Sequence, residues 1–126
     1  MNIYQINFPL KAVAKERPRM GKYCVYTSKN TVAFENSIKQ IWNAQYIKHP
    51  LLMKPLAVFI IFNFIKPKTS KNQYPSVRPD CDNLIKSLTD SLTGLAWKDD
   101  AQICILNAKK VYSLENKIEL IYQELD

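Results

Sequence analysis

Glycine and histidine are scarce in this chain. Only Gly21 and Gly94 occur among its 126 residues, so it contains neither a phosphate-binding P-loop nor the glycine-rich turn of a dinucleotide-binding fold. The one histidine is His49, beside a proline, and a Ser-His-Asp or Cys-His site would depend on it alone. These two scarcities disfavour both glycine-fingerprint nucleotide binding and histidine-based nucleophilic catalysis.

Cysteine is also rare, and long apolar segments are missing. Cys24, Cys81 and Cys104 have no C-x-x-C spacing, which argues against a disulfide framework and against a zinc knuckle. The longest apolar run, residues 56–65, is ten residues long and interrupted by Asn63, whereas a membrane-spanning helix needs about 20 residues. The first ten residues lack the basic and apolar regions of a signal peptide. We therefore expect a cytoplasmic protein.

Acidic residues are almost absent from the first part of the chain. Residues 1–79 carry 13 lysines and arginines against two acids (+11), whereas residues 80–126 carry five against nine (−4), which gives a net charge of +7. A basic body favours an anionic partner, with nucleic acid the leading candidate and an anionic membrane surface the second. The length and the apolar fraction of 47% predict one globular domain over residues 1–126.

Hydrophobic periodicity predicts an α+β fold, a mixed β-sheet with two main helices. The run 56–65 is apolar on both faces, which predicts a central strand. The first helix begins at a cap on Ser28 or Asn30 and ends near His49 and Pro50. The last two strands are expected to form an antiparallel hairpin around a turn at 114–116. In chain order we expect strand 2–8, strand 23–27, helix to about 48, strand 56–65, helix 82–93, strand 103–112 and strand 118–121, with basic loops at 10–22 and 66–79.

The helix predicted over residues 82–93 has two distinct faces. Its expected buried stripe consists of Leu84, Ile85, Leu88 and Leu92. Asp82, Lys86 and Asp90 are spaced four residues apart, so they share a face roughly opposite that stripe. Asp80 or Asp82 can cap the helix start, where free N–H groups and the positive end of the helix dipole favour negative charge. This helix therefore presents charged side chains to solvent beside a predicted basic loop.

Five of the 11 acidic residues lie within residues 78–102: Asp80, Asp82, Asp90, Asp99 and Asp100. If the strand after Asp99 and Asp100 lies beside the helix start, one of these two can complete a three-carboxylate site with Asp80 and Asp82. Such a site suits Mg²⁺ or Mn²⁺, which prefer oxygen ligands. In phosphodiester hydrolysis the metal would neutralise a phosphate oxygen, activate a water and orient the leaving group.

Lys86 lies one helical turn from Asp82, so it could pair with Asp82 at rest and stabilise transition-state charge during reaction. Simpler explanations exist for each residue alone, because Asp at a helix start is commonly a cap and an i, i+4 Asp/Lys pair is commonly a surface ion pair. A D-x-D motif also occurs in nucleotide-sugar transferases. That class predicts nucleotide diphosphate binding and no affinity for DNA.

The two basic loops are candidate contacts for DNA phosphates. Neither loop contains a base-reading motif, so recognition by shape is favoured over recognition by sequence. The candidate contact residues are Arg17, Arg19, Lys22, Lys68, Lys71 and Arg78.

The run D-C-D-N-L-I-K-S-L-T-D-S-L, followed by W-K-D-D-A-Q, resembles the RusA family of Holliday junction resolvases, as does R-P-R-M-G-K-x-x-x-Y-T at residues 17–27. The resemblance implies a homodimeric, Mg²⁺-dependent endonuclease that cuts four-way DNA junctions symmetrically. It implies that Asp80, Asp82 and Asp100 hold the metal and that Lys86 is catalytic. It also implies that Arg17, Arg19 and Lys22 contact the junction. Supporting roles would fall to Asn83, Asp90, Asp99 and Gln102.

We therefore predict a magnesium-dependent junction-resolving endodeoxyribonuclease of DNA recombination and repair. Spacing alone does not decide between Asp99 and Asp100, and the alignment to the family pattern selects Asp100. The alternatives are a nuclease acting on other branched DNA and a DNA-binding module whose carboxylates only cap the helix and favour solubility.

Overall fold

The computed structural model describes residues 2–16, 19–20, 25–26, 28–46 and 48–126. The short strand β2 lies inside the predicted basic loop 10–22, so that loop prediction was wrong at these two residues. β3 falls within the predicted strand 23–27, whose other residues lie outside the described ranges. The elements in chain order are β1 (Ile3–Phe8), β2 (Arg19–Met20), β3 (Val25–Tyr26), α1 (Lys29–Gln45), β4 (Leu56–Ile65), α2 (Cys81–Leu92), the 3₁₀ helix η1 (Asp100–Gln102), β5 (Ile103–Ser113) and β6 (Lys117–Glu124).

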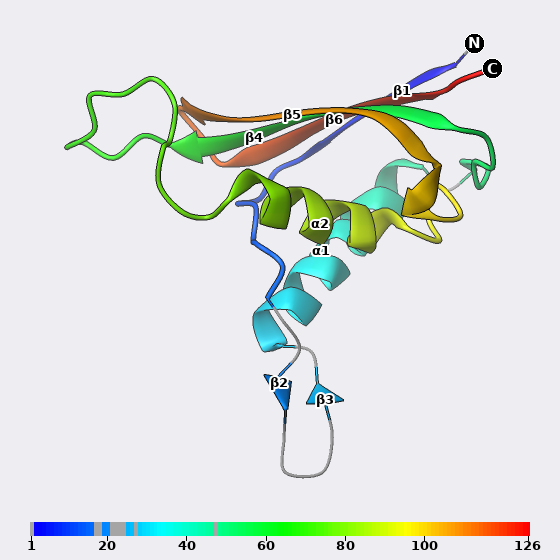
Figure 1. Ribbon diagram of the computed structural model, residues 1–126, viewed down its shortest axis with the longest axis horizontal. Coiled ribbons are helices and arrows are strands. Elements are labelled where there is room, and N and C mark those ends of the chain that lie inside the picture. The colour runs from blue at the N-terminus through cyan, green and yellow to red at the C-terminus, as the bar shows by residue number, and fades with distance from the viewer. Residues whose placement is uncertain (1, 17–18, 21–24, 27, 47) are drawn as a thin grey trace.

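The main sheet has the order β1-β6-β4-β5, with α1 and α2 on one of its faces (Figure 1). β4 pairs with β6 antiparallel and with β5 parallel, which confirms the predicted central strand. β1 pairs with β6 antiparallel, from Ile3 opposite Gln123 to Phe8 opposite Ile118. The α+β class with a mixed sheet and two main helices is thus confirmed.

The predicted hairpin between the last two strands was wrong, because β4 lies between β5 and β6. Residues 114–116 carry the chain across the end of β4, a distance of about 10 Å between alternate strands that three extended residues can span. Asn116 fixes this crossing, since its Oδ1 accepts a hydrogen bond of 3.0 Å from the backbone N–H of Ile65. The crossing lets β4, the most apolar strand, pair along both of its edges.

The core lies between the sheet and the two helices. The predicted stripe of α2 is buried at Leu84, Leu88 and Leu92, whereas Ile85 is half-buried. Each fully buried leucine contributes roughly 2–3 kcal/mol. This packing fixes the rotation of α2, so the opposite face of the helix is held toward solvent. Other buried core residues include Phe34, Ile38, Trp42, Val58, Ile60, Phe62, Ile118, Leu120 and Tyr122.

The predicted start of α1 and the glycine after α2 are confirmed, whereas the predicted end of α1 and the side-chain cap of α2 are not. Ser28 caps α1, because its Oγ accepts a hydrogen bond of 3.2 Å from the Thr31 N–H. α1 ends at Gln45, three residues before the predicted end, where the Tyr46 and His49 rings pack with Trp42. Gly94 follows α2 with a φ of 88°, a left-handed conformation that favours glycine. The described helices include none that is long and apolar enough to cross a bilayer.

The second face of the sheet carries no helix (Figure 1). Side chains alternate along a strand, so every second residue of β4 and its partners points to this open face. Phe59 of β4, Ile105 of β5 and Ile121 of β6 are exposed, with 43%, 50% and 36% of their surfaces accessible. The main sheet therefore presents apolar side chains to solvent opposite the helices.

Candidate active site

The lead-in to α2 places two carboxylates at the helix start. Asp80 occupies the N-cap position, but its side chain makes no capping hydrogen bond. Asp82 lies in the first turn, and its Oδ1 accepts a hydrogen bond of 2.9 Å from the Asn83 backbone N–H. Both residues are exposed, and neither forms an ion pair with any cation in the described part of the chain. The two carboxylates remain available to bind an external cation.

A lysine of β5 holds this lead-in in place. Lys110 Nζ donates hydrogen bonds of 2.9 Å to the carbonyl oxygens of Val77 and Pro79. Pro79 directly precedes Asp80, so the clamp fixes the backbone that carries the first carboxylate. Sequence reasoning missed Lys110, because it lies 31 residues from Pro79 and belongs to a strand whose neighbours the pattern did not reveal.

The segment after α2 forms a capped turn that carries Asp100. The Asp99 side chain accepts a hydrogen bond of 3.0 Å from the Ala101 N–H, and the Asp99 N–H donates one of 2.8 Å to Gln102 Oε1. Gln102 Nε2 donates to the carbonyls of Leu52 and Lys54 at 3.1 and 2.9 Å. Gln102 therefore ties this turn to the segment before β4, and its supporting role in a site stays a prediction.

Asp99 and Asp100 experience opposite electrostatic environments. The backbone hydrogen bond from Ala101 lowers the pKa of the Asp99 carboxyl. Partial burial, followed by the hydrogen bond to Asp99 and the nearby charge of Asp90, raises the pKa of the Asp100 carboxyl. Two neighbouring carboxylates repel one another when both are charged, and a bound cation would relieve this repulsion. Of the two carboxyls, Asp100 is thus the one whose charged form the fold disfavours.

Asp90 is a structural partner for two lysines. Its Oδ2 lies 3.3 Å from Lys15 Nζ and 3.5 Å from Lys86 Nζ, and Lys15 Nζ also lies 3.2 Å from Glu35 Oε1 of α1. Partial burial acts to lower the pKa of Lys15, but its hydrogen bonds to Glu35 and Asp90 outweigh this and raise the pKa. This four-residue network joins the N-terminal segment to both helices.

The expected resting pair between Lys86 and Asp82 was wrong. Lys86 pairs with Asp90, one turn further along α2. Asp82 instead turns its carboxylate toward the Asn83 N–H at the helix start, so it is drawn away from Lys86. Sequence spacing placed Asp82, Lys86 and Asp90 on one face but did not decide with which carboxylate Lys86 would pair.

The structure brings only part of the predicted site together. The charges of Lys86 and Asp90 act on Asp100, so these three lie near one another, whereas Asp80 and Asp82 lie at the start of α2. Within the described residues, no three histidine, cysteine or acidic side chains are grouped closely enough to hold a metal ion. The donor types nevertheless fit Mg²⁺, since all are carboxylates and the two at the helix start have no competing cation.

A family model described as Endodeoxyribonuclease RusA matches residues 9–121. The chain belongs to the RusA family. Two curated relatives also match. Over 73 residues, 56% of this chain and 56% of the relative, it is 42% identical to a "Crossover junction endodeoxyribonuclease rusA" of Lactococcus phage r1t. Over 51 residues, 40% of this chain and 36% of the relative, it is 39% identical to an "Uncharacterized protein YqaN" of Bacillus subtilis (strain 168). The matched segments thus span about half or less of these relatives.

The structure describes only some of the residues that were predicted to contact DNA in this RusA-family chain. Arg17 and Lys22 lie outside the described residues, and Arg19 lies in β2. Lys68, Lys71 and Arg78 are exposed in the loop between β4 and α2. The Lys15 backbone N–H donates a hydrogen bond of 3.0 Å to the Asn83 carbonyl. This contact brings the N-terminal segment beside the first turn of α2.

Proposed function

We propose that this RusA-family protein is a Mg²⁺-dependent, structure-selective endodeoxyribonuclease. Its substrate would be a four-way DNA junction, resolved by paired symmetric hydrolysis during recombination and repair in the cytoplasm. The observation that carries the proposal is the family match over residues 9–121, together with unpaired carboxylates at the start of α2. The phage relative's name, a crossover junction endodeoxyribonuclease, supports the junction as substrate.

The proposed metal ligands are Asp80, Asp82 and Asp100, with Mn²⁺ as a possible substitute for Mg²⁺. A bound divalent cation would supply charge neutralisation and a more acidic water. Asp80 and Asp82 share a lead-in held by Lys110, whereas Asp100 sits on the turn held by Gln102. The ligand set would be completed by bringing Asp100 and the start of α2 together around the cation.

Lys86 is the proposed cationic catalytic residue. Its side chain is 62% exposed and contacts Asp90 at 3.5 Å. A lysine ammonium has three N–H donors, so donors remain for a phosphate oxygen. Asp90 and, behind it, Lys15 would keep Lys86 on the correct side of α2. Asp90 is in this proposal a positioning residue.

The open face of the sheet is the proposed dimer interface. Phe59, Ile105 and Ile121 are exposed there beside half-buried Ile61, and Lys109 and Glu119 lie in register with Ile61 on the two neighbouring strands. A two-fold copy can match a lysine of one chain with a glutamate of the other around an apolar centre. Two copies would supply two sites, which paired cutting of a junction needs.

The proposal is tested by incubating the protein with a labelled four-way junction, three-way branch, flap or matched linear duplex, with Mg²⁺ or with chelator. Asp82→Asn is the test variant, and Glu115→Gln, an exposed acid in the turn before β6, is the charge-matched control. We expect paired symmetric cuts in the junction only, present in the control and lost in Asp82→Asn.

The other outcomes assign other functions. Junction binding without cleavage would overturn the enzyme and leave a DNA-binding module, which the absence of a closed carboxylate group among the described residues favours as the second candidate. Cutting of flaps or three-way branches in preference to four-way junctions would keep the nuclease and change its substrate. Equal cutting of the linear duplex would remove the structure selectivity.

A further inference from the structure

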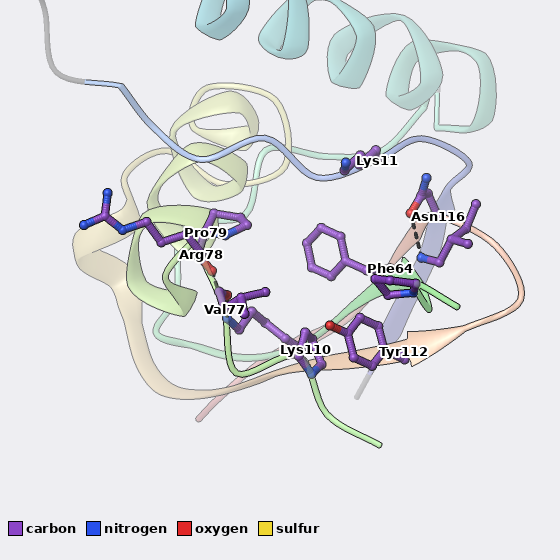
Figure 2. A pocket seen from close by; sticks show the side chains of 11 residues that line it. Lys11, Phe64, Val77, Arg78, Pro79, Lys110, Tyr112 and Asn116 are labelled. Atoms are coloured by element: carbon purple, nitrogen blue, oxygen red, sulfur yellow. Dashed lines mark hydrogen bonds between the residues drawn. The ribbon is translucent and has the colours of Figure 1, made fainter. Parts of the chain in front are cut away.

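A small cavity adjoins the lead-in to α2. Its floor is formed by Phe64 of β4 and Tyr112 of β5, which are register partners on neighbouring strands (Figure 2). α2 begins only at Cys81, so the loop between β4 and α2, rather than the helix, covers this end of the sheet. That loop is bonded to the sheet, because the Tyr112 N–H donates to the Gln73 carbonyl at 3.4 Å. The remaining walls include Pro67, Pro75, Val77 and Pro79.

The lining combines aromatic rings with positive charge. Lys11, Arg78 and Lys110 contribute the cations. The Lys110 ammonium is held by the Val77 and Pro79 carbonyls. Figure 2 shows the Arg78 side chain extending from the rim away from the two rings. Lys11 and Arg78 are exposed, so both can meet a ligand that remains partly in solvent. Aromatic faces inside and cations at the edge match a nucleotide, whose base is planar and whose phosphate is anionic.

The size of the cavity limits what it can hold. Its volume is about 210 Å³, below the roughly 300–1,000 Å³ typical of sites for drug-sized ligands. A single planar ring system fits this volume better than a whole nucleotide or a stacked pair of bases. The sugar and phosphate of the same nucleotide would then remain outside, beside the exposed lysine and arginine.

The cavity and the proposed metal site share one stretch of backbone. Pro79 lines the cavity, and the next residue is Asp80, whose Cα lies about 3.8 Å from that of Pro79. The Lys110 clamp holds both, since it binds the Pro79 carbonyl. A base seated in the cavity would therefore hold its own strand next to the carboxylates.

We propose that this cavity binds one unstacked base of a DNA strand. The inference rests on the proposed nuclease function and deepens it, because it names a source of structure selectivity. Removing a base from a duplex costs a few kcal/mol, and the cost is least for a base that is unpaired or at an interrupted stack. Branched DNA supplies such bases at the branch point, whereas a linear duplex does not.

The test measures binding rather than cleavage, in chelator. Two four-way junctions are compared, one with normal nucleotides at the branch point and one with abasic nucleotides there. The ratio of their dissociation constants is measured for the wild type, for Val77→Trp, which fills the cavity, and for Tyr112→Leu, which removes a ring from its floor. Met53→Trp is the matched control, since Met53 is 58% exposed and precedes β4 at the other end of that strand.

We expect the ratio to change on the order of tenfold between the wild type and the two cavity variants, the scale of one base stacked on an aromatic side chain. Met53→Trp keeps the wild-type ratio. Comparing ratios between proteins cancels the effect of the abasic sites on the DNA itself. Val77 is 64% exposed, so the added tryptophan is compatible with the fold, and circular dichroism checks this.

Each remaining outcome overturns the base-binding cavity, the nuclease or both. Equal ratios in all four proteins overturn the base-binding cavity and leave the nuclease intact if the junction is still cut with Mg²⁺. A changed ratio without any cutting keeps the cavity and overturns the nuclease. A wild type that binds neither junction overturns both.

Discussion

Asp82 and Asp90 lie roughly two turns apart on the same face of α2, yet they have different surroundings. Asp90 is half-buried and contacts two lysines, one of which is also paired with Glu35 of α1. Asp82 is exposed, and its carboxylate accepts a hydrogen bond from a backbone N–H. The comparison shows how one helix places the same residue type in a network that holds the fold together and, two turns earlier, at a position open to solvent.

The sharpest test of this comparison is Asp80→Asn, at the start of α2, where the carboxylates form no ion pair within the described residues. We expect junction cleavage to fall on the order of 10²–10³-fold, as when an electrostatic catalytic group is removed. The melting temperature should stay unchanged, because Asp80 makes no capping hydrogen bond. Cleavage kinetics and thermal unfolding of the same preparation measure both. A lowered melting temperature with normal cleavage would mean that Asp80 is a cap after all.

Lys110→Met should give the next largest effect. The variant leaves the Val77 and Pro79 carbonyls without their donor, so the backbone before Asp80 loosens. We expect cleavage to fall by roughly 10–100-fold, the usual effect of removing a partner that orients a ligand. Lys39→Met, at an exposed lysine of α1, removes the same charge as a control. Equal losses in both variants would assign the effect to overall charge.

Asp90→Asn should affect stability more than any other change in the network. It removes two ion pairs and leaves Lys15 with Glu35 alone. Since Asp90 and Lys15 are only partly exposed, although Lys86 is exposed, we expect a loss of about 1 kcal/mol in the free energy of unfolding. Urea titration measures it, with Glu115→Gln, whose pair with Lys117 is more exposed, as the control. No difference between the two variants would show that Asp90 and Glu115 are equally dispensable.

The smallest effect is expected from Lys15→Met at alkaline pH. The folded state raises the pKa of Lys15 above its ordinary value of 10.5. Its stabilising contribution is therefore complete below that ordinary value and is lost as pH rises through the raised pKa. The stability gap between wild type and variant should be a few tenths of a kcal/mol at neutral pH and should close at the highest pH. A gap that is constant with pH would rule out this linkage.

Local sequence patterns predicted the helices and strands of this fold better than they predicted which strands lie side by side. The apolar run of β4, the leucines of α2 and the cap at Ser28 are all short-range signals, and each is present in the structure. The pairing of β5 and β6 failed because a three-residue connection usually joins adjacent strands, and here it crosses one. Nothing local in the sequence marks that crossing.

The same limit applies to the candidate site. Carboxylate spacing identified Asp80, Asp82 and one of Asp99 and Asp100 as candidates. The resemblance to the family pattern selected Asp100, and no observation yet tests the roles of these residues. Lys15 and Lys110 were missed, because each acts on a residue distant in the sequence. A lysine in a basic segment and a lysine in a strand carry no signal of their partners until the sheet and helices are assembled.

The position of β6 has a consequence for the order in which strands can pair during synthesis. β1 begins at Ile3, yet its partner in the sheet begins at Lys117. As the chain leaves the ribosome, β1 and one edge of β4 have no strand to pair with until β6 emerges. Their open edges are competent to bind other nascent chains during that interval. The sheet closes only when the last strand inserts between the two, so translation of nearly the whole chain precedes folding of its first strand.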